Sequence, residues 1–372
     1  RFEDPDEGAE VEDGVGDFMD TPSLGIGPTN DYTYFMVLDA RPDVTGQDED
    51  NDQGTFFLDR SVEGSLSSLV SLKAIEDESN ETVSRFGFQS RYDNDGGLGS
   101  VVSSTVINEN EGTPHLIGMQ RDVGTAFRLF VDGAPDGDRP DDGSDLTPPP
   151  LRIGSHAIKD AMDGDIPETI VFNTALNTTQ RTIVQNYLSA KYDIGLASGA
   201  PNVYADDQST NGDYDRGVFG VGQESDSDFH SAAETDGLRF EASTLGDGDY
   251  LLAGYNTEGN SANSSDIGGV SALESRMERD WYWEVTGGSS LTVNVTFDLA
   301  DAGLQSVLNP APDSYVLLYR SEQTGDWTEV ATNGSVNDGD RVTFPNVTPS
   351  TYGSGYYTLG TTDRTSSPIG AQ

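Results

Sequence analysis

Acidic turns are the most frequent feature of this sequence that could bind a ligand. Asp and Asn oxygens spaced a few residues apart on a tight turn are the kind of ligands that Ca²⁺ prefers. Three groups are candidate calcium sites: Asp93, Asn94 and Asp95; Asp163 and Asp165; and Asp132, Asp136 and Asp138. None has the Glu at position twelve that completes an EF-hand loop. A solvated Asp/Gly turn is the simpler interpretation of each group, and calcium is the one cofactor that the sequence suggests.

Aromatic residues are the second candidate for chemistry. Sugar rings stack on exposed aromatic side chains that have polar groups beside them. Trp281 and Trp283 alternate with Tyr282, so the two tryptophans share one face of a strand. They are weak candidates for a carbohydrate-binding platform, because a buried tryptophan inside a sandwich is the more common use.

The residue patterns of common hydrolases are missing. Glucanases on related folds use an E-x-D-x-x-E pattern, and the nearest acidic cluster, at 75–81, has a different spacing. The histidines at 115, 156 and 230 are far apart, and the sequence contains neither H-E-x-x-H nor G-x-S-x-G. We therefore predict a protein without catalytic activity, with a polysaccharide hydrolase or lyase as the second alternative.

The net charge excludes several partners. The chain carries 65 acidic and 20 basic residues, a formal charge of −45, and just three of the basic residues are Lys. Such a surface repels phosphate backbones and anionic headgroups, which argues against nucleic acids and membrane surfaces. Acid spread along the whole chain, with Arg kept and Lys nearly absent, favours adaptation to high salt over many calcium sites.

The elements that would position these residues are short strands. Alternating runs such as 291–299 place Leu291, Val293, Val295, Phe297 and Leu299 on one face and polar residues on the other. Cysteine is absent, and no apolar run reaches the roughly 18 residues needed to cross a bilayer. The sequence predicts an all-β protein made of two tandem antiparallel β-sandwiches.

One segment reads as a helix. Asn177 and Gln180 have the spacing of a capping box, and Ile183, Val184, Tyr187 and Leu188 form one apolar stripe. Gly195 is the expected stop. We predict that this amphipathic helix closes the first sandwich at its C-terminal end.

The composition divides the chain into four parts. We expect a first sandwich at 1–196, a linker at 197–216, a second sandwich at 217–364 and a tail at 365–372 that leads to an absent segment. Because the chain starts without Met and lacks a signal peptide, we expect it to be a piece of a longer precursor.

The first part resembles the laminin-G-like modules of bacterial secreted proteins, within the concanavalin A-like lectin/glucanase superfamily. The residues that carry the resemblance are Gly164–Ile166, Glu168, Val171–Asn173, Ala175–Leu176, Tyr187–Leu188, Lys191–Tyr192 and Ile194. The resemblance implies a jelly-roll sandwich. Such modules begin with further strands, so N-terminal strands are expected to be missing here or to be supplied by another chain.

The second part is similar to a β-sandwich that often follows this module in large surface proteins of Bacteroidota. The similarity rests on Gly217–Gly222, Tyr250–Gly254, Arg279, Trp283–Val285 and Gly355–Gly360. The function of that sandwich is unknown. The resemblance implies an extracellular or cell-surface location in a bacterium, with export by the type IX route.

These observations predict a non-catalytic surface protein of adhesion or carbohydrate binding, with a polysaccharide or a surface protein as its partner. The first alternative is structural: a subunit of an extracellular filament or sheath that self-assembles into a polymer by strand complementation. An incomplete sheet would expose backbone groups that a neighbouring chain could pair.

Overall fold

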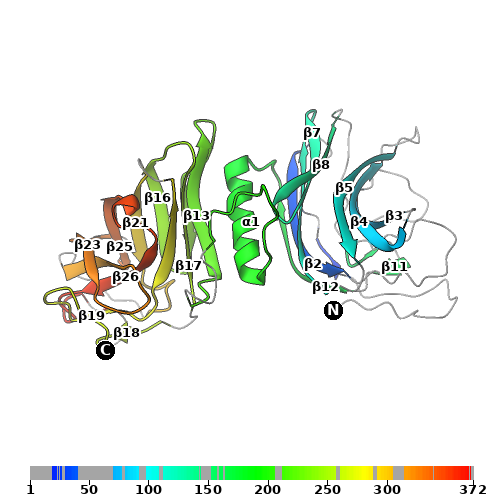
Figure 1. Ribbon diagram of the computed structural model, residues 1–372. Helices are drawn as coiled ribbons and strands as arrows, with labels where there is room; N and C mark the ends of the chain where they lie inside the picture. Colours follow the sequence, from blue (N-terminus) through cyan, green and yellow to red (C-terminus); the bar gives the residue numbers. More distant parts are fainter. Residues whose placement is uncertain are drawn as a thin grey trace. The chain divides into compact units, whose positions relative to one another are not determined.

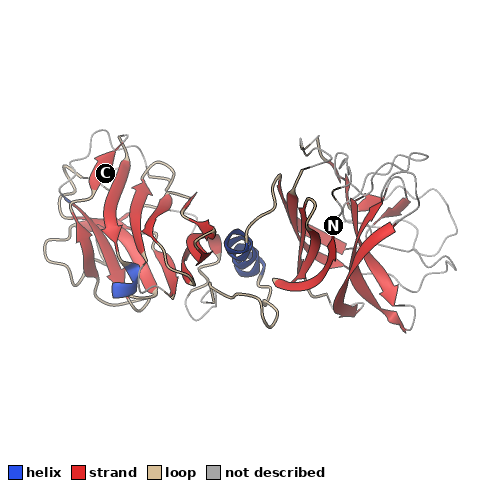
Figure 2. Cartoon of the chain, turned by 90° about the horizontal axis from the view of Figure 1, so that it is seen from above, coloured by secondary structure: helices blue, strands red, loops and turns tan. Residues whose placement is uncertain are grey.

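The computed structural model describes most of the chain. The described residues are 19–22, 24, 26, 30–40, 70–77, 80–91, 98–108, 112–141, 143, 152–156, 159–161, 164–205, 212–256, 260–287, 291–304, 314–337, 339–367 and 369. Strands dominate this part of the chain, as predicted (Figure 2). The chain divides into two compact units. Unit 1 comprises 1–176 and 194–201, and unit 2 comprises 177–193 and 202–372.

Unit 1 is built on a five-stranded antiparallel sheet. Its order is β12 (Gly164–Phe172), β2 (Tyr32–Ala40), β6 (His115–Asp122), β7 (Ala126–Val131) and β8 (Ala134–Pro140). A three-stranded sheet follows the order β3 (Val70–Asp77), β4 (Asn80–Arg91) and β5 (Leu98–Asn108), and β5 contacts β7 and β8 (Figure 1). Two short pairs complete the unit: β1 (Met19–Asp20) with β9 (Arg152–Ile153), and β10 (Ser155–His156) with β11 (Lys159–Ala161).

The core of unit 1 lies on one face of the five-stranded sheet. Tyr34, Met36 and Leu38 of β2 alternate toward it and meet Val101 of β5. The other face of β2 is also buried, since Phe35 and Val37 are inaccessible to solvent. A strand buried on both faces reads as a continuous apolar run, which explains the sequence YFMVL.

Unit 2 contains a nine-stranded and a five-stranded antiparallel sheet. The nine strands of the large sheet are β13 (Arg216–Ser225), β14 (Asp228–His230), β17 (Asp249–Tyr255), β18 (Ala262–Asn263), β19 (Ser275–Met277), β20 (Trp281–Thr286), β22 (Tyr315–Arg320), β23 (Thr328–Thr332) and β26 (Gly355–Thr361). The small sheet has the order β15 (Ala232–Thr235), β16 (Leu238–Thr244), β21 (Thr292–Asp298), β25 (Arg341–Val347) and β24 (Ser335–Asn337). A short 3₁₀ helix, η3 (Pro349–Thr351), precedes β26.

The two sheets of unit 2 enclose one apolar core. Leu291, Val293, Val295, Phe297 and Leu299 are all fully buried in it, which confirms the predicted alternation. The polar position next to Phe297 is an exception, because Asp298 is 7% exposed and accepts a hydrogen bond from Arg341. The sandwich predicted for this half of the chain is therefore present.

Helix α1 (Thr178–Tyr192) packs on unit 2, against β13 and β14 (Figure 1). Ile183 and Ala190 join a second apolar cluster on the outer face of the large sheet. The helix is therefore grouped with unit 2, and its role in closing the first sandwich stays a prediction. The capping box is confirmed, with Asn177 Oδ1 accepting from the Gln180 backbone N–H at 2.8 Å and Gln180 Oε1 accepting from the Asn177 N–H at 3.1 Å.

The C-terminal end of α1 differs from the prediction. The helix stops at Tyr192, and Asp193 adopts the left-handed conformation at φ 52° instead of Gly195. Asp is one of the few non-glycine residues that tolerate this conformation. Part of the stretch at 197–216 that was predicted as a linker is packed on unit 2. Val203, Tyr204 and Tyr214 are buried in the apolar cluster on the outer face of the large sheet.

No helix in the described ranges combines the length and apolarity required to cross a bilayer.

Candidate functional site

The acidic groups proposed from sequence do not converge where the structure describes them. Asp132 accepts hydrogen bonds from the Leu116 N–H and from His115, both at 2.9 Å. Asp136 accepts from the N–H groups of Ser104 and Thr105 and from the Ser104 hydroxyl. Both carboxylates therefore fasten neighbouring strands of unit 1.

The remaining proposed ligands lie on separate strands or outside the described residues. Asp138 is exposed on β8, and Asp165 is the backbone neighbour of Asp39 in the β12–β2 ladder. Asp93, Asn94, Asp95 and Asp163 lie outside the described residues. The described part of the chain thus neither supports nor excludes the calcium hypothesis for those four.

One group of three carboxylates does meet among the described residues: Glu234, Asp298 and Asp301. Arg341 already contacts it, donating from Nε to Asp298 at 2.8 Å and from a terminal nitrogen to Glu234 at 3.4 Å. The guanidinium supplies the positive charge that a metal would otherwise bring. This cluster is better explained as an ion-pair network than as a metal site.

The two candidate tryptophans are structural. Trp281 and Trp283 are fully buried between the sheets of unit 2. Trp283 stacks on Tyr357 with ring centroids 3.8 Å apart, and Trp281 lies edge-on to Phe297. Neither ring has an open face, so the hypothesis of a stacking platform at these residues is wrong.

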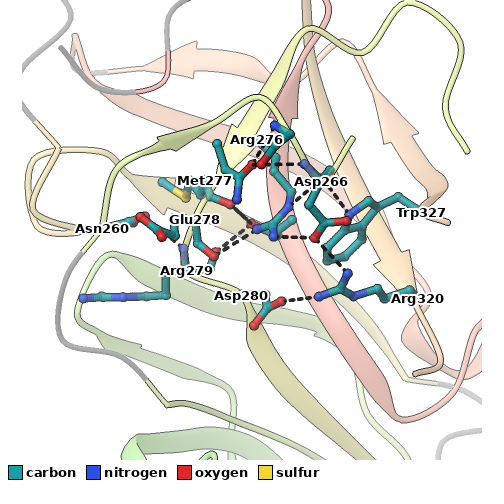
Figure 3. Close-up of polar contacts among 12 residues, drawn as sticks. Asn260, Asp266, Arg276, Met277, Glu278, Arg279, Asp280, Arg320 and Trp327 are labelled. Atoms are coloured by element: carbon teal, nitrogen blue, oxygen red, sulfur yellow. Dashed lines mark hydrogen bonds and ion pairs between the residues drawn. The ribbon is translucent and has the colours of Figure 1, made fainter. Parts of the chain in front are cut away.

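A network of arginines lies on the outer side of the large sheet (Figure 3). Arg276 and Arg320 both donate to Asp266, at 2.6 and 3.0 Å, and both guanidinium groups lie over the Trp327 ring. Arg320 also donates to Asp280 at 3.0 Å. Partial burial raises the pKa of Asp266, but the hydrogen bonds and charges of the two arginines outweigh it, so its pKa lies below the ordinary value.

This network is closed on itself. The Trp327 indole N–H donates to the Asp266 carbonyl at 3.2 Å, and Arg276 donates to the Glu278 carbonyl at 2.9 Å. Tyr214 completes the Asp280 carboxylate with a hydrogen bond of 2.5 Å. We interpret the network as a brace that fixes the segment between β18 and β20, because the hydrogen bonds named here all end on protein acceptors; the buried Arg320 Nε makes none.

A shallow groove at the edge of unit 2 is more suited to a ligand. It forms where the chain passes from β14 of the large sheet to β15 of the small sheet, and its volume is about 200 Å³. The lining includes Gln223, Asp226, Phe229, Ser231, Ser243 and Thr244. Phe229 is 46% exposed and is the one aromatic among the exposed large apolar side chains for which the structure describes burial.

The groove sets an aromatic ring beside polar groups. Phe229 and Gln223 are directly opposite each other across β14 and β13, so their side chains share one face. Gln223 donates its amide N–H to Asp247 at 2.9 Å, which leaves its carbonyl oxygen as an acceptor. Asp226 on the hairpin turn is exposed. This combination is the one that stacks on a sugar ring and accepts hydrogen bonds from its hydroxyls.

Asp228 fixes the hairpin that carries Phe229. Its carboxylate accepts from the backbone N–H groups of Thr178 and Thr179 at 3.0 and 2.8 Å, the first turn of α1. The Thr179 hydroxyl donates to the Asp228 carbonyl at 2.9 Å. Partial burial raises the pKa of Asp228, but these hydrogen bonds outweigh it and lower the pKa below its ordinary value.

Sequence reasoning missed Phe229. The signal was present, because this ring is the single aromatic residue within the polar run QESDSDFHSA. A lone aromatic on a polar hairpin cannot reach a core of its own, so exposure is the expected outcome.

Comparison with known families gives one match. The model described as "Domain of unknown function (DUF8202)" matches residues 180–352. This range begins inside α1 and ends just after η3, so the match includes most of the helix and the second sandwich except β26. No curated protein matches the chain.

Solved structures show remote likenesses. Domain 4 of AbnA, an extracellular GH43 arabinanase from Geobacillus stearothermophilus bound to arabinotriose, has a TM-score of 0.31 at 13% identity; the alignment covers 41% of this chain and 65% of that domain. Botulinum neurotoxin type C, whose cell entry depends on two ganglioside molecules, has a TM-score of 0.33 at 10% identity, covering 95% and 88%. The binding domain of Paraclostridial Mosquitocidal Protein 1 has a TM-score of 0.34 at 10% identity, covering 88% and 79%. At these TM-scores the likeness carries no conclusion about function.

Proposed function

We propose that this protein is a non-catalytic carbohydrate-binding protein of the cell surface or extracellular space, and that the Phe229 groove is its binding site. The observation that carries the proposal is the half-exposed Phe229 ring with the Gln223 amide beside it. The laminin-G-like residue pattern and the all-β architecture agree with a binding module. The partner is a polysaccharide or the glycan of a surface protein.

The groove is prepared for binding before a ligand arrives. Asp228 and the first turn of α1 hold the hairpin, and the Asp247 carboxylate holds the Gln223 amide. A site with fixed side chains loses less conformational entropy when it binds.

Affinity electrophoresis in gels that contain polysaccharides, followed by calorimetry on each hit, tests the proposal. Phe229→Ala should weaken binding, while Val102→Ala, which truncates an exposed apolar residue of unit 1, should not. Binding is measured with and without calcium, because Asp93, Asn94 and Asp95 are still a proposed calcium site. A binding constant that is equal in the wild type and Phe229→Ala would place the glycan elsewhere.

A second candidate function is assembly by strand addition. Strand β12 is paired with β2 on one side, and among the described strands it has no neighbour on the other. A groove of about 380 Å³ runs beside it, lined mainly by apolar residues that include Met19, Leu24, Ile153 and Ile166. Exposed edges of this kind pair with strands of other chains.

Light scattering at high salt separates this candidate from the first. Polymers that disappear in Met19→Asp, which puts a charge into the groove, would support a filament or sheath subunit. A monomer at all concentrations would contradict it.

A further inference from the structure

We propose that the Phe229 groove selects an uncharged sugar residue and rejects uronic acid and sulfated sugars. This inference rests on the proposed function and names the ligand class of the same site. The described residues that line the groove include the carboxylate of Asp226 but no Lys, Arg or His. An anionic sugar would therefore meet a like charge with no cation to compensate it.

The polar groups of the groove match hydroxyls. Asp226 and the side-chain carbonyl oxygen of Gln223 accept hydrogen bonds, and the Thr244 hydroxyl can donate and accept. The Ser243 hydroxyl donates to the Thr292 carbonyl at 3.2 Å and can accept from a ligand. Every hydroxyl of a neutral sugar can donate to the first pair while its ring stacks on Phe229. A carboxylate or sulfate group has no proton to donate, so wherever it replaces a hydroxyl that faces these acceptors, they lose their donor.

The size of the groove limits the contact to one sugar unit. Its volume of about 200 Å³ lies below the roughly 300–1,000 Å³ of enclosed ligand sites. An open groove at the sandwich edge can accept an internal unit of a long chain, since the neighbouring units extend into solvent. The structure thus assigns the groove to one internal sugar unit of a neutral polysaccharide.

Local selectivity must be separated from the repulsion of the whole chain. With a net charge of −45, the protein repels anionic polymers at any point of its surface in dilute buffer. At about 1 M salt the Debye length shrinks to about 3 Å, so long-range repulsion is screened while contacts inside the groove persist. The selectivity should therefore survive in 1 M salt.

The experiment uses polymers that share a backbone and differ in charge. Hydroxyethyl cellulose is compared with carboxymethyl cellulose, and dextran with dextran sulfate, by affinity electrophoresis and calorimetry in about 1 M NaCl. We expect binding to at least one neutral member, at least about tenfold weaker binding to its anionic partner, and at least about a tenfold loss in Phe229→Ala.

A charge change in the groove provides the control. Asp226→Lys should raise affinity for the anionic partner at least about tenfold, while Asp301→Lys, on an exposed loop away from the groove, should not. Equal binding of the neutral and anionic partners in 1 M salt would overturn the selectivity and leave glycan binding intact. Tighter binding of chitosan that Phe229→Ala abolishes would also overturn it, because the site would then prefer a cationic sugar. Absence of binding to every polymer would overturn the proposed function as well.

Discussion

The two units hold their buried charges in different ways. In unit 1 the side chains of Arg121 and Asp141 are 0% exposed, and Arg121 Nε donates to the carboxylate at 3.0 Å. The backbone N–H of Gly124 donates to the same carboxylate at 3.1 Å. In unit 2 the Asp266 side chain is 38% exposed and is shared by Arg276 and Arg320.

The two sets of ion pairs differ in what can replace a charged partner that a mutation removes. Water can reach Asp266 and solvate whichever charge is left, and either arginine can keep the carboxylate paired. Around Arg121 and Asp141 water has no access, so a lost partner leaves a buried charge without its counter-charge. We call Arg121 and Asp141 the dry pair, and Asp266 with Arg276 and Arg320 the wet network. The stability of unit 1 should depend strongly on the dry pair, whereas unit 2 should tolerate single changes in the wet network.

The largest effect is expected at the dry pair. Asp141→Ala should destabilise unit 1 by about 3–5 kcal/mol, because the Arg121 guanidinium is left buried without its carboxylate. All three tryptophans lie in unit 2, so calorimetry should show one transition moving down while tryptophan fluorescence of unfolding stays unchanged. Asp138→Ala, an exposed residue of β8, is the control and should cost less than about 0.5 kcal/mol. Equal effects of the two variants would remove the distinction.

The wet network should give a smaller loss. Arg320→Ala breaks ion pairs to Asp266 and Asp280 and removes the guanidinium over Trp327, but Arg276 and Tyr214 keep both carboxylates bonded. We expect about 2–3 kcal/mol, read from tryptophan fluorescence during urea unfolding. Arg239→Ala, which removes exposed pairs to Glu234 and Glu241, should be near neutral. A loss in Arg320→Ala as large as that in Asp141→Ala would contradict the idea that water compensates.

The hydrogen bonds between Asp228 and the first turn of α1 are also partly exposed to solvent. Asp228→Ala removes the acceptor of the Thr178 and Thr179 N–H groups and should cost about 1 kcal/mol. Because the hairpin is loosened, glycan affinity should fall together with stability. Asp226→Ala, two residues away and without these bonds, should leave the unfolding midpoint unchanged. A stable Asp228→Ala variant with full affinity would show that the Asp228 carboxylate does not position Phe229.

Acid provides the smallest and most specific test. The pKa of Asp266 is lower in the folded state than its ordinary value of about 3.9, so its contribution to stability is complete above that value and disappears as the pH falls through the folded-state pKa. The difference in stability between wild type and Asp266→Asn should be under about 1 kcal/mol at pH 7 and should shrink below about pH 4. Urea unfolding followed by tryptophan fluorescence at several pH values measures it. A difference that does not change with pH would mean that the ion pairs do not contribute.

Local patterns carried the successful predictions. The alternation from Leu291 to Leu299 and the capping box of Asn177 and Gln180 are properties of residues within a few positions of one another. Period-two burial and helix capping depend on backbone geometry that any such segment adopts. The all-β class followed from these patterns.

Those local patterns could not predict the candidate site. Trp281 and Trp283 have the same alternation whether their face meets solvent or a second sheet. The strands that cover them, β21 through Phe297 and β16 through Phe240, are brought there by long-range pairing. The Phe229 groove joins residues of β13, β14 and β16, which lie up to 22 positions apart between Gln223 and Leu245. The set of residues that line the groove therefore depends on which strands become neighbours in the folded unit.

The amino-acid sequence by itself determined the strands, the one long helix with its cap and the acidic character of the chain, because each depends on local periodicity or on composition. The tertiary structure alone decided that α1 belongs to unit 2, that the tryptophans are core residues and that Phe229 is exposed. Apolar faces are interchangeable in sequence, and the partner of each is chosen by the packing of the whole unit.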